Sequence, residues 1–138
     1  MNRADFQELS RMREVEAEAL LQAGHFAGAY YLAGYAVECA LKACIAKQTN
    51  EFDFPDRDAA IAAFTHDLDR LVKAAGLTAD YAMATSASPQ FVDNWQIVRQ
   101  WKETARYEAR IAEERTRELF RACTEQPHGV LTWVRRLW

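Results

Sequence analysis

The stretch HFAGAYYLAGYAVECALKACIAK, residues 25–47, decides the fold of this chain. One set of its apolar residues recurs at spacings of three and four, and a second set fills much of the remaining helix circumference. The first set is Phe26, Tyr30, Ala33, Val37, Ala40 and Cys44, and the second is Tyr31, Tyr35, Leu41 and Ile45. Gly28 and Gly34 add no side chain, and a glycine inside a helix costs about 1 kcal/mol unless packing compensates. The pattern therefore predicts a helix that is buried on most sides, at the centre of a bundle.

The length of this stretch would also suit a membrane span, but two charges argue against it. Glu38 and Lys42 lie in its middle, and each charge costs about 2.5 to 3.5 kcal/mol at the centre of a bilayer. They are four residues apart with the acid first, which favours an ion pair on one polar strip of the helix. We therefore expect no contact with a membrane.

Composition indicates a single all-α domain over residues 1–138. Half of the residues are apolar, only five are Gly and three Pro, and a chain of this size needs no disulfide, metal or cofactor to form a core. The three cysteines form no C-x-x-C motif, so we expect buried thiols and no metal site. The N-terminus is charged throughout, without the apolar core of a signal peptide, and we expect a cytoplasmic protein.

Helix signals recur along the whole chain. We expect helices over 5–22, 25–47, 59–64, 66–75, 78–85, 89–110, 111–125 and 130–138, four to five of them main helices, with an acidic loop over 48–58. Asp5 is the expected N-cap of the first helix, and its expected apolar stripe consists of Leu9, Met12, Val15, Ala19 and Leu20. Thr65, Thr78 and Pro89 are the expected start signals of three later helices.

The expected helix over 89–110 carries a basic stripe. Arg99, Lys102, Arg106 and Arg110 recur at spacings of three, four and four, and Tyr107 adds a hydroxyl and a ring. Such a stripe suits phosphate groups. Residues 1–98 hold 8 Lys and Arg against 14 Asp and Glu, a balance of −6, whereas residues 99–138 hold 9 against 6, a balance of +3. Alternatively, these cations pair with nearby glutamates and only solvate the helix.

The same expected helix also carries Trp95 and Trp101, which we interpret as core anchors. With four tryptophans in a small bundle, we expect some apolar surface to remain for a homodimer interface, formed by this helix or its neighbours. Ser10, Ser86 and Ser88 have no neighbouring base in the sequence, so no serine nucleophile is predicted.

Several motifs together resemble the HEPN domain family, whose name stands for higher eukaryote and prokaryote nucleotide-binding. They are GAYYLAGYAVECALKACIAK, THDLDRLVKAAG, ARY and the terminal GVLTWVRRLW. The central pattern matches at Ala29, Tyr31, Ala33, Gly34, Tyr35, Ala36, Glu38, Ala40, Leu41 and Lys42. The resemblance implies an up-and-down helical bundle, often dimeric. It gives structural roles to Tyr35, Glu38, Lys42 and His66, the last through a hydrogen bond that fixes a helix start.

Catalytic members of that family carry an R-x4-6-H motif, in which the histidine handles protons and the arginine stabilises phosphate charge during RNA cleavage. In this sequence Arg106 stands where the histidine would be, with six residues between it and Arg99. A guanidinium binds phosphate but does not act as a general acid or base. Arg121 and His128 have a suitable gap, but Pro127 lies between them and breaks the helix that would align them. We therefore predict no catalytic residue.

The resemblance thus favours a non-catalytic binding or regulatory module. Expected partners are a second copy of the chain and a separately encoded nucleotidyltransferase-type protein, as in toxin–antitoxin pairs of this family. Weak RNA or nucleotide binding is expected at Arg99, Lys102, Arg106, Tyr107 and Arg110. Two alternatives stay open: a metal-independent ribonuclease with an unusual site that uses Arg99, Arg106 and Tyr107, and a nucleotide-binding protein.

Overall fold

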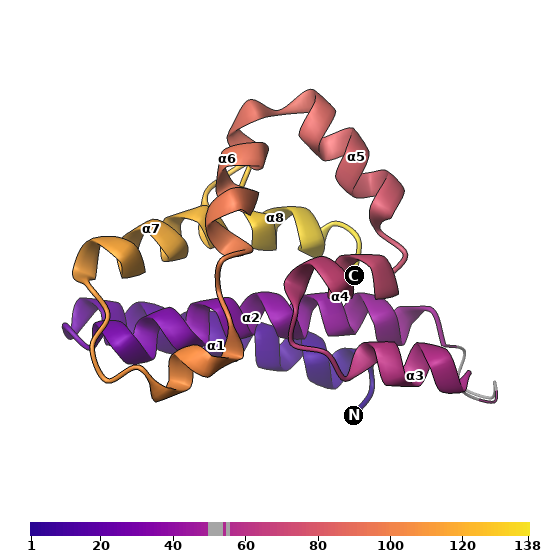
Figure 1. Ribbon diagram of the computed structural model, residues 1–138, viewed down its shortest axis with the longest axis horizontal. Coiled ribbons are helices and arrows are strands. Elements are labelled where there is room, and N and C mark those ends of the chain that lie inside the picture. Colours follow the sequence, from indigo (N-terminus) through magenta and orange to yellow (C-terminus); the bar gives the residue numbers. More distant parts are fainter. Residues whose placement is uncertain (50–53, 55) are drawn as a thin grey trace.

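The computed structural model describes residues 1–49, 54 and 56–138, and it contains no strand among them (Figure 1). Its helices are α1 (Arg3–Gln22), α2 (Phe26–Lys47), α3 (Arg57–Ala63), α4 (Leu68–Ala74), α5 (Thr78–Ala87), α6 (Pro89–Val98), the 3-10 helix η1 (Glu103–Tyr107), α7 (Glu113–Thr124) and α8 (Val130–Arg135). The predicted all-α class is confirmed. The eight predicted helices correspond to α1–α8, except that α6 and η1 replace the one helix predicted over 89–110. Part of the predicted acidic loop, residues 50–53 and 55, lies outside the described residues.

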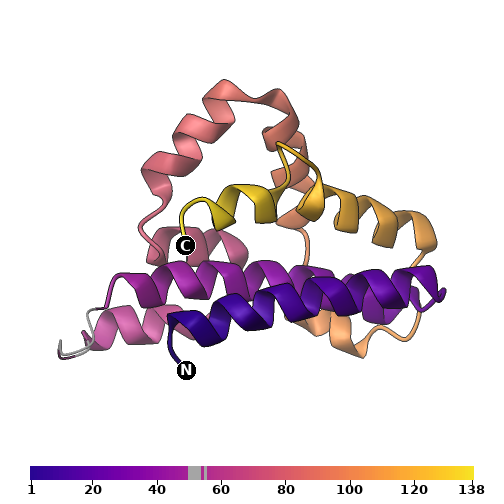
Figure 2. The ribbon, with the colours of Figure 1, turned by 180° about the vertical axis from the view of Figure 1, so that it is seen from behind.

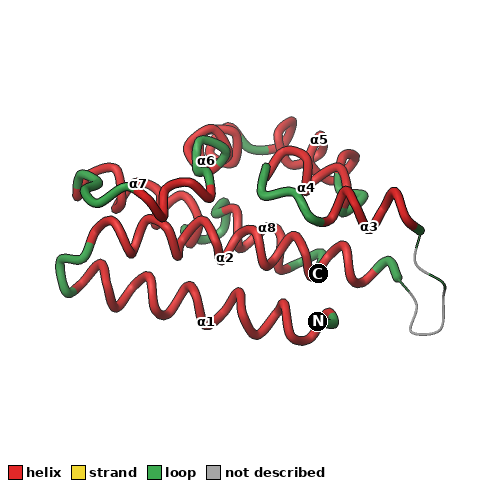
Figure 3. The backbone as a smooth tube through the Cα atoms, turned by 60° about the horizontal axis from the view of Figure 1, so that its bottom comes forward, coloured by secondary structure: helices red, strands yellow, loops and turns green. Residues whose placement is uncertain are grey.

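Helix α2 lies at the centre of the fold, as predicted. Twelve of its 22 residues are buried, and it contacts α1, α4, α7, α8 and η1. Helix α1 runs antiparallel beside it along most of its length (Figures 2 and 3). Gly24 makes the turn between them at φ 81°, in the left-handed region that favours glycine. None of the helices in the described ranges is both long and apolar enough to cross a membrane.

Helix α1 differs from the prediction in its cap and in its buried face. Its N-cap is Asn2, whose side chain accepts from the Asp5 backbone N–H at 3.0 Å, while the Asp5 carboxylate accepts from the Asn2 N–H at 2.8 Å. The fully buried residues of α1 are Ser10, Ala17 and Leu21. Small side chains let α1 approach α2 closely, and the Ser10 hydroxyl donates to the Ala36 carbonyl at 2.9 Å. The predicted apolar stripe through Met12, Val15 and Ala19 therefore faces solvent.

The prediction of one helix over 89–110 was wrong beyond Val98. Ser88 caps α6, with Pro89 in the first turn as expected, but the helix ends at Val98 and the chain turns so that Trp101 packs on Gly34 of α2. Trp95 is buried elsewhere, among the rings of Tyr81, Phe91 and Trp133. The two tryptophans are 1% and 2% exposed, so both belong to the core of the chain itself and offer no surface to a second copy.

The later helices cover α2 from above in the view of Figure 1. There α7 and α8 lie above α2, and α5 and α6 form the top of the molecule. Helix α4 begins after Asp67, whose side chain accepts from the Arg70 backbone N–H at 3.0 Å. The predicted cap, Thr65, instead accepts from the Asp67 N–H. Thr78 is the first residue of α5, but its side chain forms no cap hydrogen bond.

Candidate phosphate-binding surface

The cations of residues 99–110 do not share one side of a helix, because the chain is helical only in parts of this range. Arg99 follows the end of α6, and its Nη2 donates to Asp69 Oδ2 of α4 at 2.9 Å. Arg110 lies between η1 and α7, where it lines a hollow of about 360 Å³ with His25 and Phe26. Lys102 directly precedes η1, and Arg106 lies in its last turn. The predicted stripe is thus divided among three places.

Lys102, Arg106 and Tyr107 form the part that stays together, which we call the η1 surface. All three residues are exposed, and the Arg106 guanidinium carbon lies 4.9 Å from the centroid of the Tyr107 ring. The pKa of Arg106 is raised, mainly by its hydrogen bond with Tyr107. Arg106 Nη1 lies 3.9 Å from Glu103 Oε2, and Lys102 has no acidic partner in the part of the chain that the structure describes. The η1 surface therefore offers two permanent cations and a ring to solvent.

A polar cluster lies beneath η1. Glu38 of α2 is only 1% exposed, and its Oε1 lies 2.9 Å from Lys42 Nζ and 2.9 Å from His66 Nδ1. The other ring nitrogen of His66, Nε2, lies 2.9 Å from Glu103 Oε2. The predicted ion pair between Glu38 and Lys42 is confirmed, although its carboxylate is buried. His66 does not cap α4 but connects α2 with η1.

The contacts of His66 limit its chemistry. Both ring nitrogens face carboxylate oxygens, and an ionised carboxylate only accepts hydrogen bonds. Both nitrogens of His66 are engaged by carboxylate oxygens, so neither is free to take a proton from a substrate hydroxyl. The sequence did not reveal that Glu103 contacts His66, because the two residues are 37 positions apart. The only signal that Glu103 gave in the sequence was its place among cations.

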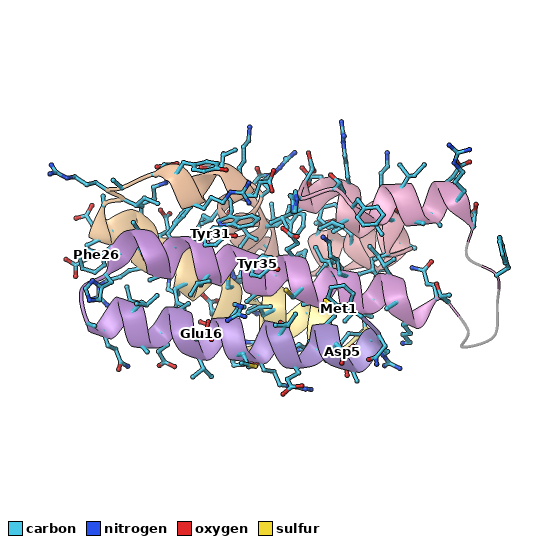
Figure 4. All side chains as sticks on the ribbon, turned by 90° about the horizontal axis from the view of Figure 1, so that it is seen from below. Met1, Asp5, Glu16, Phe26, Tyr31 and Tyr35 are labelled. Atoms are coloured by element: carbon cyan, nitrogen blue, oxygen red, sulfur yellow. The ribbon has the colours of Figure 1, made fainter. Side chains whose placement is uncertain are left out.

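Stacked aromatic rings hold η1 against α2. The centroids of Tyr31 and Tyr35 are 5.9 Å apart with an interplanar angle of 9°, and those of Tyr31 and Trp101 are 6.1 Å apart. Figure 4 shows Tyr31 and Tyr35 on the side of α2 that faces the η1 segment. Burial raises the pKa of Tyr35 and keeps its hydroxyl neutral. Tyr35 thus supports the surface from below and does not take part in it.

The contact between His128 and Ser88 does not form a catalytic site. His128 Nδ1 lies 2.9 Å from Ser88 Oγ, so the expectation that Ser88 has no neighbouring base was wrong. Ser88 is buried, however, and its Oγ accepts from the Phe91 backbone N–H as the cap of α6. Its hydroxyl therefore has a structural role. No group of three or more His, Cys, Asp or Glu side chains within the described ranges is arranged to hold a metal ion.

Comparison with protein families gives one match. A family model described as HEPN domain matches residues 15–137, a span that includes every helix from the second half of α1 to α8 and therefore the whole η1 surface. Searches of curated proteins and of solved structures gave no match.

Proposed function

Because this chain belongs to the HEPN domain family, whose functions concern nucleotides and RNA, we propose that it is a non-catalytic module that binds phosphate-bearing ligands at the η1 surface. One observation carries the proposal: the position next to Tyr107 holds a guanidinium, and the histidine nearest to it in the cluster, His66, has both ring nitrogens against carboxylates. The site can attract a phosphate, but neither Arg106 nor His66 has a free nitrogen to take a proton from a ligand.

Binding is supported by the charges and by the ring. Lys102 and Arg106 can form charge-assisted hydrogen bonds to phosphate oxygens, and the exposed face of Tyr107 suits stacking with an unpaired base. Glu103 lies 3.9 Å from Arg106, and the first 98 residues carry a balance of −6. Both features lower the attraction for a polyanion. We therefore expect modest affinity that falls steeply as the salt concentration rises.

Cleavage is a separate question. Attack by a ribose 2′-hydroxyl needs a group that accepts its proton, and Arg106 stays protonated at every pH at which the protein is folded. Loss of general acid–base catalysis removes about 10²- to 10⁴-fold in rate. We expect no RNA cleavage by the wild-type protein when metal ions are chelated.

The Arg106→His variant provides the test. RNA is incubated with chelator and either the wild-type protein, Arg106→His or the control Arg57→His, which adds a histidine to the exposed start of α3. We expect no fragments with the wild-type protein or with the control. Fragments with Arg106→His, which restores the R-x6-H spacing in the sequence, would show that position 106 and Arg99 act in one site although the structure pairs Arg99 with Asp69. If the wild-type protein already cuts RNA and Arg99→Ala abolishes the cutting, the ribonuclease alternative is right and the non-catalytic proposal is wrong.

Binding is measured separately, by titration of a labelled single-stranded RNA at about 50 and 200 mM salt. We expect Lys102→Ala/Arg106→Ala to weaken binding and to reduce its salt dependence. The matched control is Arg57→Ala/Arg121→Ala, which removes two exposed cations from α3 and α7. If the two double variants bind RNA with equal affinity, RNA does not bind at the η1 surface.

The proposed module also has protein partners. A homodimer is supported by the apolar residues that α1 exposes, Met12 and Val15. A complex with a nucleotidyltransferase-type protein is supported by the family resemblance alone, and co-elution of the two proteins after joint expression tests it.

A further inference from the structure

The Glu103 carboxylate lies between two nitrogen groups. Its Oε2 is 2.9 Å from His66 Nε2 and 3.9 Å from Arg106 Nη1. The shorter distance is that of a hydrogen bond, whereas the longer one is beyond hydrogen-bond range. Glu103 is therefore engaged by His66, and the Arg106 guanidinium is left open to a ligand.

The local geometry of η1 favours the other arrangement. Glu103 and Arg106 are three positions apart in a 3-10 helix, in which side chains at this spacing lie directly above one another. An acid and a base at this spacing readily form an ion pair. Their side chains are 30% and 46% exposed, so both have room to turn. A contact from outside η1 therefore keeps Glu103 from closing on Arg106.

The other contact of His66 explains this restraint. His66 Nδ1 lies 2.9 Å from Oε1 of Glu38, a residue of α2 that is buried and also contacts Lys42. Since protein interiors are close-packed, the Glu38 carboxylate has little freedom to reorient. The imidazole ring is rigid, so a ring that is fixed at Nδ1 also has its Nε2 fixed, beside Glu103. A row of contacts thus leads from the buried side of α2 to the η1 surface.

We propose that His66 is a positioning residue of the η1 surface, which holds Glu103 away from Arg106 and so keeps this cation available to a phosphate group. The inference rests on the proposed function, and it adds a residue that acts without touching the ligand. When the contact with His66 is lost, Glu103 turns to Arg106. A phosphate must then displace a carboxylate before it reaches the guanidinium.

Two substitutions of His66 separate the contacts of its ring. Asparagine carries its amide nitrogen at the place of Nδ1, and glutamine carries it at the place of Nε2. His66→Asn therefore keeps a donor for Glu38 and loses the donor for Glu103, whereas His66→Gln keeps a donor for Glu103. We expect His66→Asn to weaken binding of the labelled RNA about two- to fivefold, the value of one exposed ion pair. His66→Gln should weaken it less.

Glu103→Gln provides the rescue. A neutral amide at position 103 has no charge to place on Arg106, so His66→Asn should not weaken RNA binding further when it is combined with Glu103→Gln. A residue that only stabilises the fold would affect binding equally in both backgrounds, and circular dichroism melts show whether each variant is folded. The inference is wrong if His66→Asn has the same effect with and without Glu103→Gln, or if it leaves the RNA affinity unchanged.

The reaction of Arg106 with phenylglyoxal gives a measurement that needs no RNA. Phenylglyoxal attacks the neutral guanidine, and a paired carboxylate favours the charged form. Peptide mass spectrometry should show slower modification of Arg106 in His66→Asn and recovery in His66→Asn/Glu103→Gln, with the exposed Arg57 as internal reference. If Arg106 responds in this way and the wild-type protein binds no RNA, only the proposed function fails. If RNA binds and the modification rate is the same in all variants, only this inference fails.

Discussion

Gly34 is the residue of α2 on which the Trp101 ring packs. A Cβ atom at this position would overlap the indole ring of Trp101, whereas a Cβ at Gly28 of the same helix would meet only Leu20 Cδ1, at 3.2 Å. Trp101 is almost fully buried and has no room to move away, but the end of the half-buried Leu20 side chain can shift. Glycine at position 34 is therefore a packing requirement, and at position 28 it is not.

We expect Gly34→Ala to lower the free energy of unfolding by about 1 to 3 kcal/mol, as overpacked cores do. Gly28→Ala should be neutral or stabilising by up to about 1 kcal/mol, because alanine is the better helix former. Urea unfolding of both variants measures the difference. Equal midpoints would mean that Trp101 does not pack on α2 at this point.

The second prediction concerns the buried Glu38 carboxylate. Its Oε2 has no hydrogen-bond partner in the described part of the chain, and its Oε1 depends on Lys42 and His66. Lys42→Met removes one of these two partners and leaves the buried Glu38 charge poorly compensated, which costs about 3 kcal/mol or more. Glu38→Met/Lys42→Met removes both charges and should be more stable than the single variant in thermal unfolding. A double variant that is less stable than Lys42→Met would show that the pair itself stabilises the fold.

The cluster around Glu38 shows what sequence can and cannot predict at this scale. The pair of Glu38 and Lys42 follows from a spacing of four within one helix, which is local and so was predictable. The contacts of His66 with Glu38 and Glu103 join segments 28 and 37 positions apart, and such pairing depends on how the helices pack. The pairing of Arg99 with Asp69 is long-range in the same way, 30 positions apart, and it removes Arg99 from the predicted stripe.

At the scale of elements, α6 shows how burial overrides periodicity. The spacing of cations over 99–110 continues the helical pattern of α6, yet the chain leaves the helix after Val98. In a continuous helix, Trp95 and Trp101 would point about 120° apart at 100° per residue, and one apolar side could not bury both. The turn after Val98 sends Trp101 to α2 and leaves Trp95 among the aromatic rings of α5, α6 and α8. The existence of the helix was predictable, and its end was not.

Helix α2 carries the third prediction, which concerns its thiols. Burial raises the pKa of Cys39 and Cys44 from 9.0 to about 11. The folded protein therefore keeps these thiols protonated where the unfolded chain loses its protons. The stability contributed by the protonated thiols is present below pH 9 and is lost as the pH rises through about 11.

We expect the urea midpoint to fall between pH 9 and 11, and to fall less in Cys39→Ala/Cys44→Ala. Tyr30 and Tyr35 have pKa values raised by burial, so part of the fall of the urea midpoint with pH should remain in the variant. Iodoacetamide should label the native thiols at about pH 8 far more slowly than the unfolded chain, since only the thiolate reacts. An unchanged pH slope in the variant would assign the alkaline loss to other groups.

At the scale of the whole molecule, α1 leaves apolar side chains exposed that no other described element covers. It packs almost entirely on α2, and its outer side exposes Met12 and Val15, which are 45% and 66% exposed. The sequence pattern identified these residues as apolar and periodic but could not tell which face of α1 meets α2. Small residues, Ser10 and Ala17, occupy that face instead. The stripe expected in the core thus lies outside.

This stripe changes where a homodimer is expected. Trp95 and Trp101 are buried within one chain, so we expect a homodimer interface on α1 instead. Two α1 helices packed antiparallel about a two-fold axis between positions 13 and 14 bring Met12 of one copy against Val15 of the other, as a self-complementary interface requires. Light scattering at micromolar concentration should then give about twice the chain mass of 15.8 kDa.

Val15→Glu should convert the dimer to a monomer without unfolding it, because it places two carboxylates at the centre of the apolar contact while leaving the face toward α2 unchanged. The matched control is Met83→Glu, which makes a comparable change at a residue of α5 that is also exposed, and it should remain dimeric. A monomeric wild-type protein would exclude the homodimer, and dimers of all three proteins would move the interface away from α1. Loss of the dimer in Met83→Glu alone would place it on α5.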